Sequence, residues 1–385
     1  MKALRILTPD FEALGEIAGY TSLSLTRRHF GVGDFELHIP ARAPGTADIG
    51  VDTLLAPVGA PEKAMIVESV TYEEAKAELT LRGCTLDGLV KRRLAVPPPA
   101  SGQTFGWDRI VGDAETLFKH FAANNLTEPA DPRRQIPRLT LAGNLHRGMK
   151  DLAWQARFEP LDALLKSLAE FADLGWHIVP DLESKLLVFD VAPGRDLTVG
   201  NAQGGGARAM VSLDMGNAGE MKHVIDAAGM RNVAYVGGQG EDEHRLILAV
   251  GAADLGTETP QGEQTAPELE AAIAGRARRE VWVEGGSLEL PQELLAAGKR
   301  KLRQTEAKNT IQGAVLQHGA FQYGRDFDLG DRVTLKTRMG WVDARAVEVR
   351  ETYARDRPVQ LDITFGDAPV TVTGVIGELQ RTVVR

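Results

Sequence analysis

Hydrophobic and polar residues alternate along much of the first 95 residues. In YTSLSLTRRHF (20–30), serine and threonine separate Leu23 from Leu25, so that the two leucines share one face of an extended chain. The same alternation continues in GVGDFELHIP (31–40), AMIVESVTY (64–72) and AELTLRG (77–83). A period of two is typical of strands with one buried face. We therefore predict a β-domain over residues 1–95.

A helical period appears after the proline-rich break VPPPASG (96–102). The segment 112–126 predicts a helix with Asp113 as its N-cap. A second helix is predicted over 159–175, with Pro160 in its first turn and Gly175 at C′. The following segment, WHIVPDLESKLLVFDV (176–191), predicts a strand, a turn and a strand. Together these patterns indicate a small α+β unit over 96–200.

Strand patterns return from residue 201 onward. They occur in NVAYV (232–236), RLILAV (245–250), REVWVEGG (279–286), DLGDRVTLKT (328–337), WVDARAVEVRETY (341–353) and VQLDITFG (359–366). Residues 252–270 predict a long exposed loop, and PQELLAAGKRKLRQTEAKNTI (291–311) predicts one surface helix, interrupted or bent at Gly298. We predict a β-domain over 201–385 with a helical insertion near 265–312.

Composition and charge exclude several function classes. The chain has 385 residues, enough for two or three domains, and its 41 glycines suit many strands and tight turns. A net charge of −9 argues against sequence-specific nucleic-acid binding, which needs clustered Lys and Arg. The basic runs 27–28, 91–93 and 276–279 are predicted to lie on solvated faces or in ion pairs between subunits.

The residue types that usually carry chemistry show no catalytic pattern. The single cysteine, Cys84, excludes an internal disulfide and suits a buried hydrophobic position. The eight histidines lack H-E-x-x-H spacing, and no G-x-S-x-G motif is present. The first residues have no signal-peptide core, and no apolar stretch is long enough for a membrane anchor. We predict synthesis in the cytoplasm and no catalytic, cofactor-binding or metal-binding residues.

The segment VGGQGEDEHR (236–245) is the most ambiguous stretch of the chain. Its acidic residues and the apolar RLILAV behind it argue against a dinucleotide loop, which needs a helix after the glycines. Three adjacent carboxylates diverge in an extended chain, so a weak metal site at 241–244 is the most they could form, and His244 is predicted to be a solvated loop residue. A hairpin is favoured, with the glycines adopting positive φ in the turn.

Taken in order, these segments resemble a known family. YTSLSLTRRHFGVGDFELHIP, LTLRGCTLDGLVKRRL, PLDALLKSLAEFADLGWHIV, NVAYVGGQGEDEHR and RDFDLGDRVTLKT…LDITFG resemble the tail-hub (tail-associated, baseplate hub) proteins of long non-contractile-tailed phages and prophages. The resemblance covers about residues 18–375. It implies a β-rich α+β fold with two tube-forming β-barrel-like domains, 1–95 and 201–385, and an inserted α+β unit, 96–200. The hairpin at 232–250 would open the second tube domain.

The resemblance also implies a function and partners. The chain is expected to be a virion structural protein at the tail tip, a homotrimer whose ring joins the six-fold tail tube to a three-fold tip and lines the DNA channel. Its expected partners are the distal tail (tail tube adaptor) protein, the tape measure protein and separate tip spike or fibre proteins. Because the chain stops about 20 residues after ITFG, we expect a minimal hub that is not an enzyme. Two alternatives stay open: a tail-tip peptidoglycan hydrolase, and a carbohydrate- or small-ligand-binding β-protein.

Overall fold

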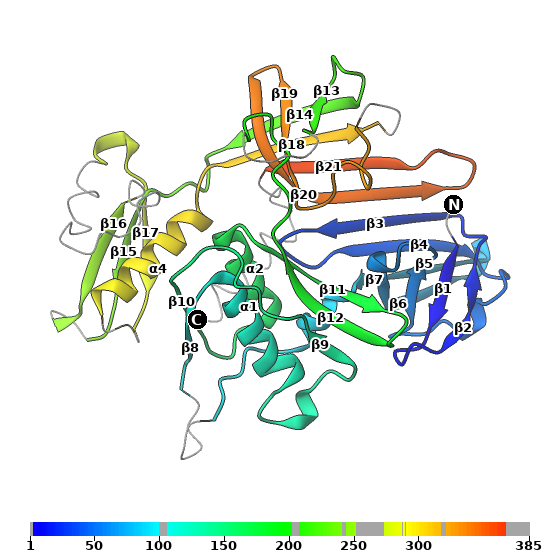
Figure 1. Ribbon diagram of the computed structural model, residues 1–385, viewed down its shortest axis with the longest axis horizontal. Coiled ribbons are helices and arrows are strands. Elements are labelled where there is room, and N and C mark those ends of the chain that lie inside the picture. Colours follow the sequence, from blue (N-terminus) through cyan, green and yellow to red (C-terminus); the bar gives the residue numbers. More distant parts are fainter. Residues whose placement is uncertain are drawn as a thin grey trace. The chain divides into compact units, whose positions relative to one another are not determined.

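The computed structural model is rich in β-strands and contains few helices (Figure 1). It describes residues 3–99, 106–201, 208–240, 244–251, 273–286, 288, 290–316 and 321–366. The chain divides into two compact units. Unit 1 contains residues 1–223 and 310–385, and unit 2 contains residues 224–309.

The elements of unit 1 follow one another in three groups. The first group is β1 (Leu4–Leu7), β2 (Ala13–Ile17), β3 (Ser22–Arg28), β4 (Asp34–Pro40), β5 (Leu54–Pro57), β6 (Met65–Glu73) and β7 (Glu78–Thr85). The second is β8 (Asp108–Gly112), α1 (Ala114–Ala122), β9 (Leu139–Leu141), β10 (Leu152–Ala156), α2 (Leu161–Ala172), β11 (Gly175–Asp181) and β12 (Leu186–Ala192). The third is β13 (Met210–Ser212), β14 (Ala218–Asp226), β18 (Lys308–Val315), β19 (Arg332–Thr337), β20 (Gly340–Ala354) and β21 (Gln360–Gly366).

Short helical turns connect these elements. They are η1 (Thr46–Asp48), η2 (Pro61–Lys63), η3 (Glu74–Lys76), η4 (Leu86–Arg92), η5 (Ala123–Thr127), η6 (Pro132–Arg134) and, in unit 2, η9 (Gly275–Ala277). In the segment LTLRGCTLDGLVKRRL, the residues after β7 form the 3-10 helix η4.

The first and third groups form one 13-stranded sheet among the described residues. Its main path runs β14-β18-β21-β20-β3-β4-β7-β6-β5-β1-β2, and β13 joins through β19, which pairs with β20. The predicted alternation holds here, because Leu23 and Leu25 of β3 and Phe35 and Leu37 of β4 are buried. The antiparallel pairing of β3 with β20 therefore connects strands more than 300 residues apart in the sequence (Figure 1).

Two separate hydrophobic cores lie along this sheet. One contains residues of β1, β3, β4, β6 and β7, such as Leu4, Leu25 and Leu81. The other contains residues of β18, β19, β20 and β21, such as Val333, Val349 and Phe365. The β3–β20 pairing therefore joins two β-rich bodies that each bury their own side chains.

The second group of unit 1 forms the predicted helices and the predicted strand pair. Helix α1 begins after Asp113, whose side chain accepts a hydrogen bond from the Thr116 N–H at 2.9 Å. Strands β11 and β12 pair antiparallel, and β9 joins β12 in parallel. The predicted end of α2 is wrong: Asp173, not Gly175, adopts the left-handed conformation with φ 51°. Gly175 begins β11, where an added Cβ would lie 2.3 Å from the His29 ring.

Unit 2 is a small α/β unit with its own sheet. Strands β16 (Ile247–Gly251), β15 (Val233–Gly237) and β17 (Glu280–Glu284) lie side by side in this order. The predicted hairpin is present as the antiparallel pair β15–β16, but it is part of this three-stranded sheet and not of the 13-stranded sheet. The hairpin therefore does not begin the 13-stranded sheet.

The glycines of the hairpin have different roles. Gly240 has φ 110°, as predicted for the turn. Gly237 and Gly238 do not adopt positive φ, so that part of the prediction is wrong. They provide room instead, because an added Cβ would lie 2.5 Å from the Trp282 ring at Gly237 and 2.7 Å from the Leu288 carbonyl oxygen at Gly238.

Helix α4 (Pro291–Gln304) is shorter and more regular than predicted. It runs through Gly298 without a break, and residues 308–311, which we assigned to its end, begin β18. Gly298 lies where the helix approaches the sheet, because an added Cβ would be 2.6 Å from the Val250 side chain. The predicted loop 252–270 and the acidic residues 241–243 lie outside the described residues.

Candidate functional site

At the β3–β20 pairing lies a cluster of charged and aromatic side chains, which are largely buried except for Asp328, whose side chain is 50% exposed. We call it the junction cluster; its members are Arg27, Lys63, Tyr323, Asp328 and Glu351. Arg27 on β3 and Glu351 on β20 are almost fully buried, with side-chain exposures of 14% and 3%. Because Arg27 pairs with Val349 in the strand register, the cluster lies on the boundary between the two hydrophobic cores.

Every charge in the junction cluster has a partner of opposite sign. The Lys63 ammonium donates to both Glu351 carboxylate oxygens, at 2.6 and 2.8 Å. Arg27 donates to Asp328 at 3.2 Å and to the Tyr323 hydroxyl. Burial lowers the pKa of Arg27, but Tyr323, Asp328 and Glu351 raise it by more, so that it stays charged. The cluster holds four charges, two of each sign, so that each charge is compensated within the network.

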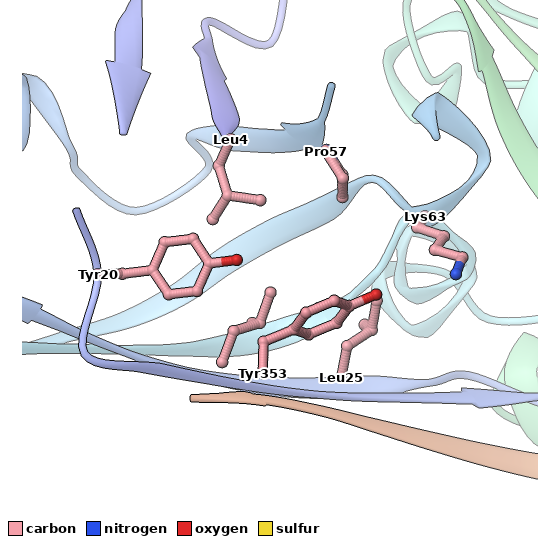
Figure 2. A pocket seen from close by; sticks show the side chains of 7 residues that line it. Leu4, Tyr20, Leu25, Pro57, Lys63 and Tyr353 are labelled. Atoms are coloured by element: carbon pink, nitrogen blue, oxygen red, sulfur yellow. The ribbon is translucent and has the colours of Figure 1, made fainter. Parts of the chain in front are cut away.

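A small pocket adjoins this cluster (Figure 2). It is lined by Leu4, Tyr20, Leu23, Leu25, Pro57, Lys63 and Tyr353 and has a volume of about 10 Å³. That is roughly the room needed by one water molecule. The rings of Tyr20 and Tyr353 both lie at its wall, and burial raises the pKa of Tyr20 to about 12. The pocket is therefore too small for a substrate, and its tyrosines stay protonated at neutral pH.

His29 is the most unusual buried group that the sequence analysis did not select. Its side chain is fully buried and neither ring nitrogen has a hydrogen-bond partner in the structure. Added Cβ atoms at Gly175 and Gly330 would lie 2.3 and 2.5 Å from the ring, so the two glycines enclose it. Burial, then His177 and Arg345, lower its pKa to about 2. His29 is thus a neutral packing residue where β3, β11 and the segment before β19 meet.

The side chains singled out from the sequence have ordinary environments. Cys84 is buried as predicted, its thiol donates to Glu68 at 3.2 Å, and burial raises its pKa to about 12. His244 is exposed. Within the described residues, no three or more His, Cys, Asp and Glu side chains gather as a metal site would require. Nor is any described helix both long and apolar enough to cross a membrane.

The basic runs form ion pairs inside this chain. Arg28 pairs with Asp34 at 2.6 Å and with Glu348 at 2.7 Å, and Arg278 pairs with Glu280 at 2.5 Å. Arg92 pairs with Asp52. The predicted alternative of ion pairs between subunits is therefore not needed for these arginines.

The surface of unit 1 offers edge strands and one apolar patch. In the described part of the sheet, β2 and β14 end the path and have one partner strand each. Four large exposed side chains lie at the turns that follow β13 and β19 and at the start of β20: Leu213, Met215, Met339 and Trp341. Lys336 links these turns, since its ammonium lies 2.6 Å from the Asp214 carboxylate and 5.7 Å from the Trp341 ring centroid. Unpaired edges and exposed apolar groups are typical of surfaces that bind other chains.

Comparison with solved structures identifies the class of protein that has this fold. The chain is similar to prophage tail protein gp18 from Listeria monocytogenes EGD-e, with TM-score 0.52, 11% identity and full coverage of both chains. It is similar to the tail protein from Neisseria meningitidis MC58, with TM-score 0.52 and 15% identity over 95% of this chain and 96% of that one. The 43 kDa tail protein of prophage MuSo2 from Shewanella oneidensis gives TM-score 0.53 and 11% identity over 94% and 98%. The fold is that of phage tail proteins.

A comparison of the sequence with protein families identifies the family. Residues 3–367 match the family model described as Siphovirus ReqiPepy6 Gp37-like protein, and the chain belongs to this family. No curated protein matches the chain in sequence. The resemblance to phage and prophage tail proteins is confirmed: the chain has their fold and belongs to a siphovirus protein family.

Proposed function

We propose that three copies of this chain form the hub ring at the distal tip of the phage tail. The two β-rich bodies on either side of the β3–β20 pairing would be the two tube domains, for which we keep the bounds 1–95 and 201–385, with 96–200 as the insert. Six such bodies in a trimer give a pseudo-six-fold ring. This ring would join the six-fold tail tube to a three-fold tip and line the DNA channel.

The observation that carries this proposal is the position of the edge strands. In the described sheet, β2 and β14 lie at opposite ends of the strand path, and each has a single partner. A neighbouring copy on each side would cover these two edges, which is how closed rings satisfy exposed strands. Strand β13, which pairs only with β19, forms a third edge of the described sheet. The net charge of −9 is consistent with a channel wall that repels DNA and lets it pass.

The proposed role is structural and not enzymatic. The charged groups of the junction cluster are paired with one another, and the adjoining pocket has room for about one water molecule. The partners we propose are the distal tail protein, the tape measure protein and a separate spike or fibre.

Native mass spectrometry of the purified chain tests the ring. We expect a species of three times the chain mass at micromolar concentration. Leu14→Asp on β2 combined with Ile225→Asp on β14 places a charge on each edge and should give monomers. The control is Val111→Asp, because Val111 is exposed on β8, outside the 13-stranded sheet. A wild-type monomer, or a trimer that tolerates both edge charges, would refute the proposed assembly.

A further inference from the structure

Among the described residues, the three-stranded sheet of unit 2 has one face covered by α4 and one open face. Ala234 and Val236 of β15 and Val250 of β16 pack in one core with Leu294 of α4. Because side chains alternate along a strand, the residues between them point to the other face. On that face lie Tyr235 of β15 and Trp282 of β17.

The two aromatic side chains lie side by side. Tyr235 and Trp282 are direct neighbours in the parallel register of β15 and β17. The indole of Trp282 extends across β15 above Gly237, where an added Cβ would lie 2.5 Å from two of its ring carbons. Trp282 nevertheless stays 48% exposed. Gly237 thus allows the ring to lie along the sheet with an open side toward solvent.

Two arginines and two glutamates frame these rings. The Arg278 guanidinium lies 5.8 Å from the Tyr235 ring centroid, donates to the Tyr235 hydroxyl at 2.7 Å and pairs with Glu280. Arg245 lies 5.3 Å from the Trp282 centroid, pairs with Glu284 and donates to the Gly238 carbonyl oxygen at 3.1 Å. These two arginines and two glutamates have no net charge together, and they place hydrogen-bond donors next to acceptors.

We propose that this open face of unit 2 binds an uncharged glycan chain. Exposed ring faces stack on the C–H groups of sugars, and planar Arg and Glu groups match pairs of sugar hydroxyls, which donate and accept. A polyanion fits less well, because Glu280 and Glu284 cancel both arginine charges. A protein partner fits less well because Glu is depleted at the core of protein interfaces, although Tyr, Trp and Arg are enriched there. This proposal does not depend on the proposed trimeric hub ring.

Affinity electrophoresis of the full chain tests the site. The gels contain one of three uncharged polysaccharides, dextran, hydroxyethylcellulose or galactomannan, or the polyanion heparin. We expect retardation by at least one uncharged polymer and none by heparin. Trp282→Ala should weaken that binding about tenfold or more. The control is Trp341→Ala, which removes an exposed tryptophan that also lies beside a cation, but in unit 1.

A second variant distinguishes loss of the indole surface from loss of the fold. Gly237→Ala keeps the indole but displaces it, and we expect weaker binding with an unchanged circular dichroism spectrum. Three outcomes would overturn the proposal: no retardation by any of the uncharged polymers, full binding by Trp282→Ala, or stronger retardation by heparin than by every uncharged polymer.

Discussion

The junction cluster of unit 1 and the open face of unit 2 use the same kinds of side chain for opposite purposes. In the junction cluster, Arg27 lies 6.0 Å from the Tyr323 ring centroid and faces Glu351. On the open face, Arg278 lies 5.8 Å from the Tyr235 ring and pairs with Glu280. The first set is enclosed between two hydrophobic cores, whereas the second lies on an uncovered sheet.

The difference shows that burial, and not residue type, decides what an Arg–Glu–aromatic group does. A buried ion network must be complete, because removing one member leaves an uncompensated charge. An exposed one is held weakly, keeps water access and can exchange partners with a ligand. The junction cluster therefore fixes the arrangement of strands, and the open face of unit 2 is available for recognition.

The largest expected effect is on the junction cluster. Glu351→Leu leaves Arg27 and Lys63 buried without their shared carboxylate, and we expect unit 1 to lose about 3–5 kcal/mol of unfolding free energy. The matched change in unit 2, Glu284→Leu, removes an exposed partner of Arg245 and should cost less than about 1 kcal/mol. Urea unfolding of both variants measures the difference. Equal losses would show that burial does not distinguish the two sites.

A second effect is a pH dependence caused by His29. Because its folded pKa is lowered to about 2 from an ordinary value of 6.5, the folded protein keeps the ring neutral while the unfolded chain takes up a proton. This contribution to stability is complete above pH 6.5 and is lost as the pH falls, by about 1.4 kcal/mol per pH unit between pH 6 and pH 3. Unfolding free energies at several pH values give the slope. In the variant His29→Leu, the slope of unfolding free energy against pH should be smaller by this amount. The same slope in the variant and the wild type would contradict a neutral, buried His29.

A smaller effect is expected where α4 approaches the sheet of unit 2. Gly298→Ala places a methyl group 2.6 Å from the Val250 side chain, and overpacking of this kind costs about 1–3 kcal/mol. Gly229→Ala is the control, since no atom lies within 4 Å of an added Cβ there. Hydrogen exchange of the β15–β17 amides measures the loss. Protection that stays at the wild-type level would mean that the helix can move away without cost.

The smallest expected effect concerns the reactivity of the Cys84 thiol. Cys84 is buried and its pKa is raised to about 12 by burial, so the native protein should not react measurably with iodoacetamide at pH 8. The urea-unfolded chain should react fully under the same conditions, as mass spectrometry would show. Rapid labelling of the native protein would mean that β7 opens readily.

Local patterns predicted the strands well, and long-range contacts explain what they missed. The alternation in β3 and β4 depends only on neighbouring residues, and it predicted the correct buried faces. Arg27 donates to Asp328, which follows 301 residues later, so no local pattern could reveal the junction cluster. We assigned Gly237 to a turn and Gly298 to a helix bend. Both glycines instead leave room for a side chain, that of Trp282 and that of Val250, and these contacts depend on tertiary structure that no local pattern shows.

The open face of unit 2 could not be predicted from the sequence for a related reason. The segment REVWVEGG predicted a strand, and Trp282 between two glutamates on one face was its only visible signal. That Tyr235 lies beside Trp282 follows from the parallel pairing of β15 with β17, two strands that are not consecutive. Domain bounds at 95 and 200 stay a prediction.

Imaging of the intact phage particle by cryo-electron microscopy, with this chain located in the map, tests the proposed hub most directly. We expect three copies around the tail axis at the distal tip, with β2 and β14 at the contacts between copies. A different copy number, or a position away from the tip, would contradict the hub assignment.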